Sequence, residues 1–197
     1  MEITASLVKE LREKTGTGMM DCKKALQENN GEIEKAVEYL RKKGIATAQK
    51  RADKATNEGV IEAYIHPGSK LGVLVEINCE TDFVAKTDDF KSFARDIAMH
   101  IAASSPLAVD KDDLDKDFIE KEMDIYKSQA ENLNKPANIV EKIAQGKLDK
   151  RLSEICLLTQ PFVKIPDKTV KDHLMDLVAK LGENVTIRKF VRFRIGE

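Results

Sequence analysis

The sequence predicts an α+β protein, because helical and strand patterns occupy separate stretches of the chain rather than alternating regularly. The first fifty residues carry apolar side chains at helical spacing, whereas residues 60–78 and 185–195 contain β-rich runs. Of 197 residues, 42% are hydrophobic and 34% charged, the balance of a globular protein with a real core. We therefore expect a small antiparallel sheet together with several helices.

The N-terminal segment, residues 1–50, predicts a domain of three short helices. Apolar residues recur at helical spacing in three stretches, separated by two glycine-containing turns. Helices this short are not stable alone, so they must share one small core. The third is expected to end before Gly44, and a basic, Ala-rich linker at 46–55 is expected to lead into an α+β core formed by residues 51–197.

The core is predicted from a change of periodicity. Two β-rich runs flank a short Pro-Gly loop and indicate an antiparallel hairpin at 60–78. The other expected elements are a helix capped near Thr87 and ended by Pro106, a charged helical hairpin at 113–158 that breaks at 132–136 and extends from the core, a helix at 169–181, and a closing strand at 185–195.

Charge and cysteine content argue against several classes of protein. The net charge is −1, without the basic surplus usual for a nucleic-acid binder. Three widely spaced cysteines argue against both a disulfide framework and a zinc site. The first residues do not form a secretory signal, and no apolar run is long enough to span a membrane. We expect a cytoplasmic protein with no metal, no membrane and no direct nucleic-acid partner.

The motifs of common enzymes are also missing. The sequence has no GxxxxGK[ST], GxGxxG, GxSxG or HExxH, and its three histidines are scattered. A hydrolase that used Glu80 and Asp82 would have no second clustered acid or nucleophile. The chain is therefore expected not to be an enzyme and to act by binding.

The most informative stretch is CETDFVAK at residues 79–86, between a predicted strand and a predicted helix. In one interpretation Thr81 or Asp82 turns the chain and Phe83 packs into the core, as phenylalanine usually does. In the other, Phe83 and Asp82 are exposed and push an apolar ring and a negative charge into a partner. The residues alone leave both open, with the first favoured.

Two further features have a structural and a functional interpretation. Met19 and Met20 follow a glycine-containing loop, and either pack a small bundle or serve as adaptable interface residues. Basic residues on the last strand either discourage unwanted strand pairing or contact RNA, and those at 41–54 would contribute to the same RNA contact. An RNA- or ribosome-associated protein is thus the alternative binding function, and it predicts RNA affinity that depends strongly on salt.

Several stretches together resemble one family in its order along the chain. They are ITASLVKELREKTGTGMMDCKKAL at 3–26, NCETDFVAK at 78–86, AMHIAAS at 98–104, LTQPFVK at 158–164 and IRKFVRFRIGE at 187–197. They resemble the elongation factor Ts family, and the resemblance spans essentially the whole chain. It implies a guanine-nucleotide exchange factor, without a cofactor, that releases GDP from elongation factor Tu.

The resemblance also implies which residues bind. In this family a ubiquitin-associated-like N-terminal helical domain grips the nucleotide domain of elongation factor Tu, and the TDFV stretch enters that domain beside its Mg²⁺ site. Matched to this chain, the latter residues are Thr81, Asp82, Phe83 and Val84, and the N-terminal contacts are Arg12, Met19, Met20 and Lys23. His66, in the hairpin loop, is a weaker candidate.

Finally, a homodimer is expected. Longer members of the family carry two related halves in the core, whereas this chain has the length of one core unit, so two chains would together supply two. On the closing strand, we expect Val185, Ile187, Val191, Phe193 and Ile195 to face a helix layer. The opposite face, with Tyr64 and Phe190, would then need a second copy or the hairpin at 113–158 to cover it.

Overall fold

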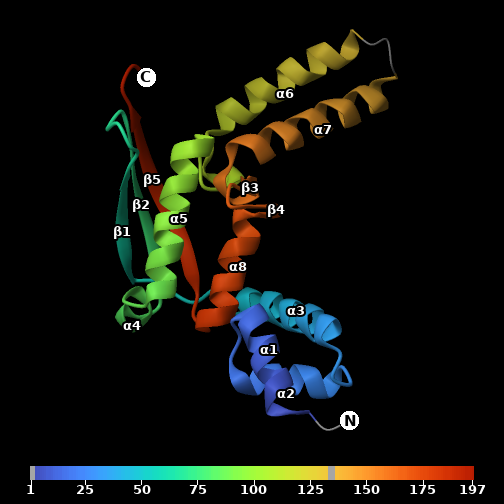
Figure 1. Cartoon of the computed structure of the whole chain (residues 1–197). Helices are drawn as coiled ribbons and strands as arrows, with labels where there is room; N and C mark the ends of the chain where they lie inside the picture. Colours follow the sequence, from blue (N-terminus) through green and yellow to red (C-terminus); the bar gives the residue numbers. More distant parts are fainter. Residues whose placement is uncertain (1–2, 133–135) are drawn as a thin grey trace. The chain divides into compact units, whose positions relative to one another are not determined.

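The computed structural model describes residues 3–132 and 136–197 (Figure 1). Helices and strands occupy separate stretches, which confirms the α+β class. In chain order they are α1 (Ala5–Thr15), α2 (Met19–Glu28), α3 (Ile33–Arg51), β1 (Glu58–Ile65), β2 (Leu71–Cys79), α4 (Asp82–Ala85), α5 (Asp88–Ser104), α6 (Lys116–Glu131), α7 (Ala137–Ile155), β3 (Pro161–Phe162), β4 (Ile165–Thr169), α8 (Val170–Leu181) and β5 (Val185–Arg194).

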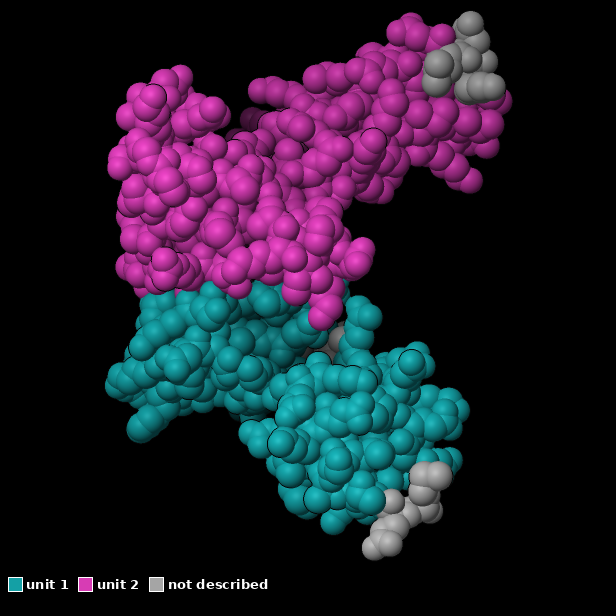
Figure 2. All heavy atoms as spheres, viewed as in Figure 1, with its two compact units in different colours: residues 1–60, 77–93, 172–186 teal, residues 61–76, 94–171, 187–197 magenta. Residues whose placement is uncertain are grey.

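The chain forms two compact units, coloured separately in Figure 2. Unit 1 consists of residues 1–60, 77–93 and 172–186, and unit 2 of residues 61–76, 94–171 and 187–197. The strands β1, β2 and β5 and the helix α5 pass through both units, so each contains part of them. The domain boundary expected after residue 50 is a different division of the chain and stays a prediction.

The first three helices form in the predicted places and share one core. Thr4 caps α1, since its Oγ1 accepts from the Leu7 N–H at 3.3 Å, and Gly16 ends it in the left-handed region at φ 66°. The buried side chains come from all three helices: Val8, Leu11, Cys22, Ala25, Leu26, Ala36 and Leu40. Three short amphipathic helices are thus stabilised by one another.

The predicted end of the third helix is wrong. Helix α3 continues through Gly44 to Arg51, so much of the expected linker at 46–55 is helical. A glycine inside a helix costs about 1 kcal/mol relative to alanine, but a Cβ at Gly44 would lie only 2.8 Å from the Cβ of Ala179 on α8. The glycine therefore allows a close approach of two helices in unit 1 rather than ending one of them.

The main sheet has the strand order β1-β2-β5. The predicted hairpin is confirmed, and the His66 N–H closes it by donating to the Leu71 carbonyl at 2.9 Å. Alternate residues of β2 are buried, as are most apolar residues along α5, from Phe90 to Ala102. A second sheet, in which β3 pairs with β4 antiparallel, was not predicted because its strands are only two and five residues long.

The predicted alternation along the closing strand holds only for its first half. Val185 and Ile187 are buried, as expected, but Val191, Phe193 and Ile195 are exposed. The alternation shifts by one residue at Arg188 and Lys189, which are consecutive and both exposed. A one-residue shift moves every later side chain to the other face of a sheet.

The charged helical hairpin is also present. Helices α6 and α7 run side by side in Figure 1 and bury small and aliphatic side chains: Ala130, Val140, Ala144 and Leu148. The predicted break at 132–136 includes residues 133–135, which lie outside the described part of the chain. The helices predicted after Thr87 and at 169–181 are confirmed as α5 and α8.

Candidate partner-binding site

Residues 81–84, which we call the TDFV segment, lie between β2 and α5. Thr81 is the N-cap of α4, a single turn formed by Asp82–Ala85. Phe83 is 79% exposed, whereas Ala85 is 7% exposed and takes the buried position of the turn. The interpretation in which Phe83 packs into the core is therefore wrong. An exposed phenylalanine is uncommon, because burying its ring is strongly favourable.

Thr81 is fixed through all of its polar groups. Its backbone N–H donates to Oε2 of Glu183 at 3.0 Å, and its hydroxyl donates to Oε1 of the same carboxylate at 2.7 Å. The hydroxyl oxygen also lies 3.5 Å from the Val84 N–H, and the Thr81 carbonyl accepts from the Cys79 thiol at 3.1 Å. The segment thus starts from a residue with a defined orientation.

Glu80, the preceding residue, is held in the same way. Its Oε1 accepts from the Asn184 N–H at 2.6 Å and from the Arg51 guanidinium at 3.0 Å. The Asn184 N–H, together with Arg51, holds the pKa of Glu80 below its ordinary value, although partial burial acts in the opposite direction. Because these groups stabilise the charged form, Glu80 is an ionised anchor at neutral pH.

Asp82 has its own cation. Its Oδ2 lies 2.6 Å from Nζ of Lys86, one helical turn away, and this ion pair raises the pKa of Lys86. Glu80 pairs with Arg51 instead. The two carboxylates thus pair with different cations.

The N-terminal candidates lie on α1 and at the start of α2, also in unit 1. Met19 and Met20 are 44% and 78% exposed, so neither belongs to the helical core. Met20 and Lys23 line a shallow hollow of about 490 Å³ on α2. Arg12 is an exposed residue of α1. The structure thus places these four side chains at the surface, on elements other than α4.

His66 belongs to unit 2 and lies at the turn between β1 and β2. Its Nδ1 is 3.0 Å from the hydroxyl of Tyr64, and the ring is exposed. It is accessible to a partner, but it shares no described hydrogen bond with the TDFV segment, which belongs to unit 1.

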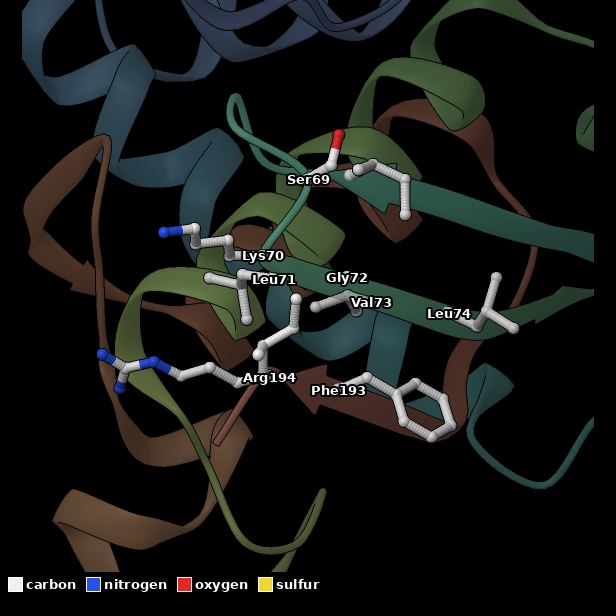
Figure 3. Close-up of a pocket in the computed structure, with 10 residues that line it drawn as sticks. Ser69, Lys70, Leu71, Gly72, Val73, Leu74, Phe193 and Arg194 are labelled. Carbon is white, nitrogen blue, oxygen red and sulfur yellow. The ribbon is translucent and has the colours of Figure 1, made fainter. Parts of the chain in front are cut away.

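Unit 2 has an open apolar face on the main sheet. Leu74 on β2 and Phe193 on β5 are on neighbouring strands and line one shallow hollow of about 520 Å³ (Figure 3). Six large apolar side chains on β1, β2 and β5, or directly after β5, are 46–74% exposed: Ile61, Ile65, Leu74, Val191, Phe193 and Ile195. Tyr64 and Phe190 are only half exposed. The uncovered face is therefore not the one expected, and the α6–α7 hairpin does not cover it.

Among residues 3–132 and 136–197, no three His, Cys, Asp or Glu side chains are gathered so that they could hold a metal ion. None of the helices found in these residues has both the length and the apolar character needed to cross a membrane.

Sequence reasoning missed Glu183 and Asn184, which bind Thr81 and the preceding Glu80 from 102 and 104 positions away. They follow Gly182, which ends α8 at φ 72°, and precede the buried start of β5. Two polar residues between a helix end and a strand usually form only a turn. One signal in the sequence could have indicated Asn184. It directly precedes a strand that is expected to be buried, and a buried polar side chain needs hydrogen-bond partners.

Comparisons with known proteins identify the family of the chain. The family profile described as Elongation factor TS matches residues 1–197. The chain is 62% identical to elongation factor Ts of Carboxydothermus hydrogenoformans over 195 residues, which cover 99% of this chain and 90% of that protein. It is 55% identical to elongation factor Ts of Geotalea daltonii, covering 100% and 91%, and 55% identical to that of Desulfosudis oleivorans, covering 99% and 98%. The chain belongs to the elongation factor Ts family and is therefore a translation elongation factor.

Proposed function

We propose that this chain is the guanine-nucleotide exchange factor of elongation factor Tu, which binds the GDP form, promotes the release of GDP and allows GTP to bind. Membership of the family supports the choice of partner. The observation that supports the mechanism most is Phe83, an exposed aromatic ring on a turn whose first residue is fixed by a carboxylate. A rigidly presented aromatic residue is the usual centre of a binding site.

The TDFV segment is proposed to act at the Mg²⁺ and phosphate site of the partner. GDP is held there by backbone N–H groups around its phosphates and by a metal that offsets their charge. Phe83 supplies an apolar side chain that displaces part of these surroundings, and Asp82 brings a negative charge close to the metal or its ligands. Thr81 and Val84 hold the turn in shape, since one caps it and the other donates to that cap.

Exchange of this kind needs only linkage between two binding events. If the factor weakens the binding of GDP by some ratio, GDP weakens the binding of the factor by the same ratio. GTP that enters the emptied site then expels the factor by the same reciprocity. No covalent chemistry is involved, so the proposal requires neither a catalytic residue nor a cofactor. The cytoplasm, where translation takes place, is the proposed location.

The second proposed contact is the N-terminal surface formed by Arg12, Met19, Met20 and Lys23. Met19 and Met20 are flexible apolar side chains exposed side by side in sequence, and Lys23 lies in the same hollow as Met20. Binding through this surface would hold the factor on its partner while the TDFV segment disturbs the nucleotide site. His66 is a further, weaker contact in this proposal.

We also propose that two copies of the chain associate through the open apolar face of the sheet in unit 2. The side chains on it stay exposed although they are as apolar as those of a core. A two-fold arrangement would place Phe193 and Ile65 of each copy against the same surface of the other. The proposal commits to a second copy because the family resemblance implies two core units and this chain contains one.

The experiment that tests the function is release of labelled GDP from elongation factor Tu after addition of the purified chain. A catalytic amount of the chain should increase the release rate, because GTP expels the factor after each exchange and one copy then acts repeatedly. The matched comparison is labelled RNA in the same buffer, with salt varied. Unchanged GDP release together with tight, salt-dependent RNA binding would replace this proposal with the RNA-binding alternative.

A further inference from the structure

We propose that Glu183 is a positioning residue for nucleotide exchange: its carboxylate fixes Thr81 and thereby presents Phe83 to the partner in a preformed turn. This inference rests on the exchange function proposed above and assigns a role to a residue outside the TDFV segment.

The Glu183 carboxylate binds Thr81 in a bidentate manner, through two hydrogen bonds. One carboxylate oxygen accepts from the Thr81 N–H at 3.0 Å and the other from the Thr81 hydroxyl at 2.7 Å. Two parallel bonds fix an orientation as well as a distance, and bonds to a charged acceptor are stronger than neutral ones. Because the hydroxyl proton points to Glu183, a lone pair is left for the Val84 N–H, which completes the cap of α4.

The carboxylate itself is on a rigid support. The next residue, Asn184, is 6% exposed, and its side-chain amide donates to the carbonyls of Lys54 at 2.8 Å and Ala52 at 3.3 Å. Its backbone N–H donates to Glu80. Glu183 and Asn184, the two residues before β5, thus bind Thr81 and Glu80, the first residue of the TDFV segment and the residue before it. The start of the segment is therefore held at two consecutive residues.

This anchor matters because α4 is a single turn, and two other polar contacts that order it, a thiol bond from Cys79 to Thr81 and the solvated Asp82–Lys86 ion pair, are both weak. A helix of one turn is not stable alone, since nucleation is unfavourable. Phe83 is 79% exposed and therefore gains little from packing within the chain. Without the anchor, the segment would have to be ordered when it binds, and this loss of conformational entropy weakens binding. Glu183 should therefore affect exchange more than it affects global stability.

The test uses the full chain with four single variants and one double variant, Glu183→Gln with Thr81→Val. Glu183→Gln keeps the size of the side chain, but its amide nitrogen cannot accept a bond from Thr81. Thr81→Val removes the hydroxyl from the opposite side, and Thr81→Ser restores it. Glu141→Gln, on the exposed surface of α7, is the control for the loss of one charge. For each protein we measure stimulation of GDP release, thermal unfolding, and hydrogen exchange of the Thr81 amide by NMR without the partner.

We expect Glu183→Gln and Thr81→Val to reduce stimulation by about tenfold each, the equivalent of one charge-assisted hydrogen bond. Glu183→Gln should also make the Thr81 amide exchange faster, and it should add little in the Thr81→Val background because both changes remove the same bond. Thr81→Ser should recover most of the stimulation that Thr81→Val loses, and Glu141→Gln should behave like the parent chain.

Three outcomes are decisive. Full stimulation by a folded Glu183→Gln variant overturns the positioning role while leaving the exchange function intact. A parent chain that does not stimulate release overturns both. If Glu183→Gln does not fold, Thr81→Val measures the same bond from the other side, and full stimulation by that variant also overturns the role.

Discussion

Asp82 and Lys86 form an ion pair across the single turn of α4, with 2.6 Å between Oδ2 and Nζ. The pair is partly solvated, and exposed pairs one helical turn apart contribute only about 0.3–0.5 kcal/mol. Its presence means that the negative charge of the TDFV segment is balanced in the free protein. A partner that takes up Asp82 has to compete with Lys86 for it.

Variants of this ion pair can distinguish the effect of the Asp82 charge on exchange from the effect of the stability of the turn. Asp82→Asn and Lys86→Gln both break the ion pair, but only the first removes the carboxylate. We predict that Asp82→Asn lowers stimulation of GDP release several-fold and that Lys86→Gln does not lower it, while both change the unfolding free energy by less than about 0.5 kcal/mol. Equal losses of stimulation would show that the turn, and not the charge, is what the partner requires.

Phe83→Ala should separate binding from folding in the same way. The side chain is 79% exposed, so its removal should leave the melting temperature unchanged. Stimulation of GDP release should fall at least about tenfold, which corresponds to ~1.4 kcal/mol of differential binding. Ile125→Ala on α6, a residue that is 50% exposed, is the control for loss of a surface apolar side chain. A Phe83→Ala variant that exchanges nucleotide at the parent rate would remove the main support for the mechanism.

The N-terminal surface makes a different prediction, because it is proposed to bind rather than to disturb the nucleotide. Met20→Ser and Lys23→Ser should raise the concentration of factor needed for half-maximal stimulation, with a smaller effect on the maximal rate. Lys127→Ser on α6 removes a comparable charge from the hairpin and should change neither quantity. A lower maximal rate at an unchanged half-maximal concentration would contradict the division of roles between α2 and α4. Titration of the factor against labelled GDP release measures both.

The elements predicted correctly are those that local pattern determines. The helix over 88–104 has a continuous apolar stripe, and the hairpin at 60–78 has β-rich runs on both sides of a turn. The TDFV segment was also found from sequence, but the exposure of Phe83 was not, because phenylalanine in a turn is more often buried.

The features that were missed depend on contacts between distant parts of the chain. Gly44 does not end α3 because Ala179 packs against it, and nothing near Gly44 in sequence reports that contact. The bond from Glu183 to Thr81 spans 102 positions. The shift at Arg188 and Lys189 leaves the apolar pattern of the strand unchanged in sequence, although it decides which face carries Phe193.

His100 predicts a dependence of stability on pH. The ring is fully buried in unit 2, where Nε2 lies 2.9 Å from Oε1 of Gln160, and Nδ1 accepts from the Val163 N–H at 3.3 Å. The Val163 bond requires neutral imidazole. Burial lowers the pKa of His100, although the bond to Gln160 acts in the opposite direction. Asp96, also on α5, forms an ion pair with Lys164 at 2.6 Å.

Because the pKa of His100 is lower in the folded than in the unfolded chain, the unfolded chain binds more protons once the pH falls below about 6.5. The free energy of unfolding should therefore decrease as the pH falls from 7 to 5. Above pH 7, His100 should cause no further change of this free energy with pH. Denaturant unfolding at both pH values measures it. The decrease should be smaller in His100→Gln than in the parent chain. His66→Gln, which changes an exposed ring, should keep it, and an equal decrease in all three would exclude His100 as the cause.

The last prediction concerns the open apolar face of unit 2. Phe193 is 67% exposed and Ile65 63% exposed, and both line the hollow in Figure 3. A carboxylate placed in a buried apolar interface costs several kcal/mol, whereas the same change on a solvated surface costs little. Phe193→Glu and Ile65→Glu should therefore convert a dimer to a monomer without unfolding it.

Light scattering at micromolar concentration should give about twice the chain mass of 22.1 kDa for the parent and 22.1 kDa for each variant. Ile125→Glu on α6 should stay dimeric. A parent chain of 22.1 kDa would rule out the dimer, and a Phe193→Glu variant that stays dimeric would move the interface away from this face.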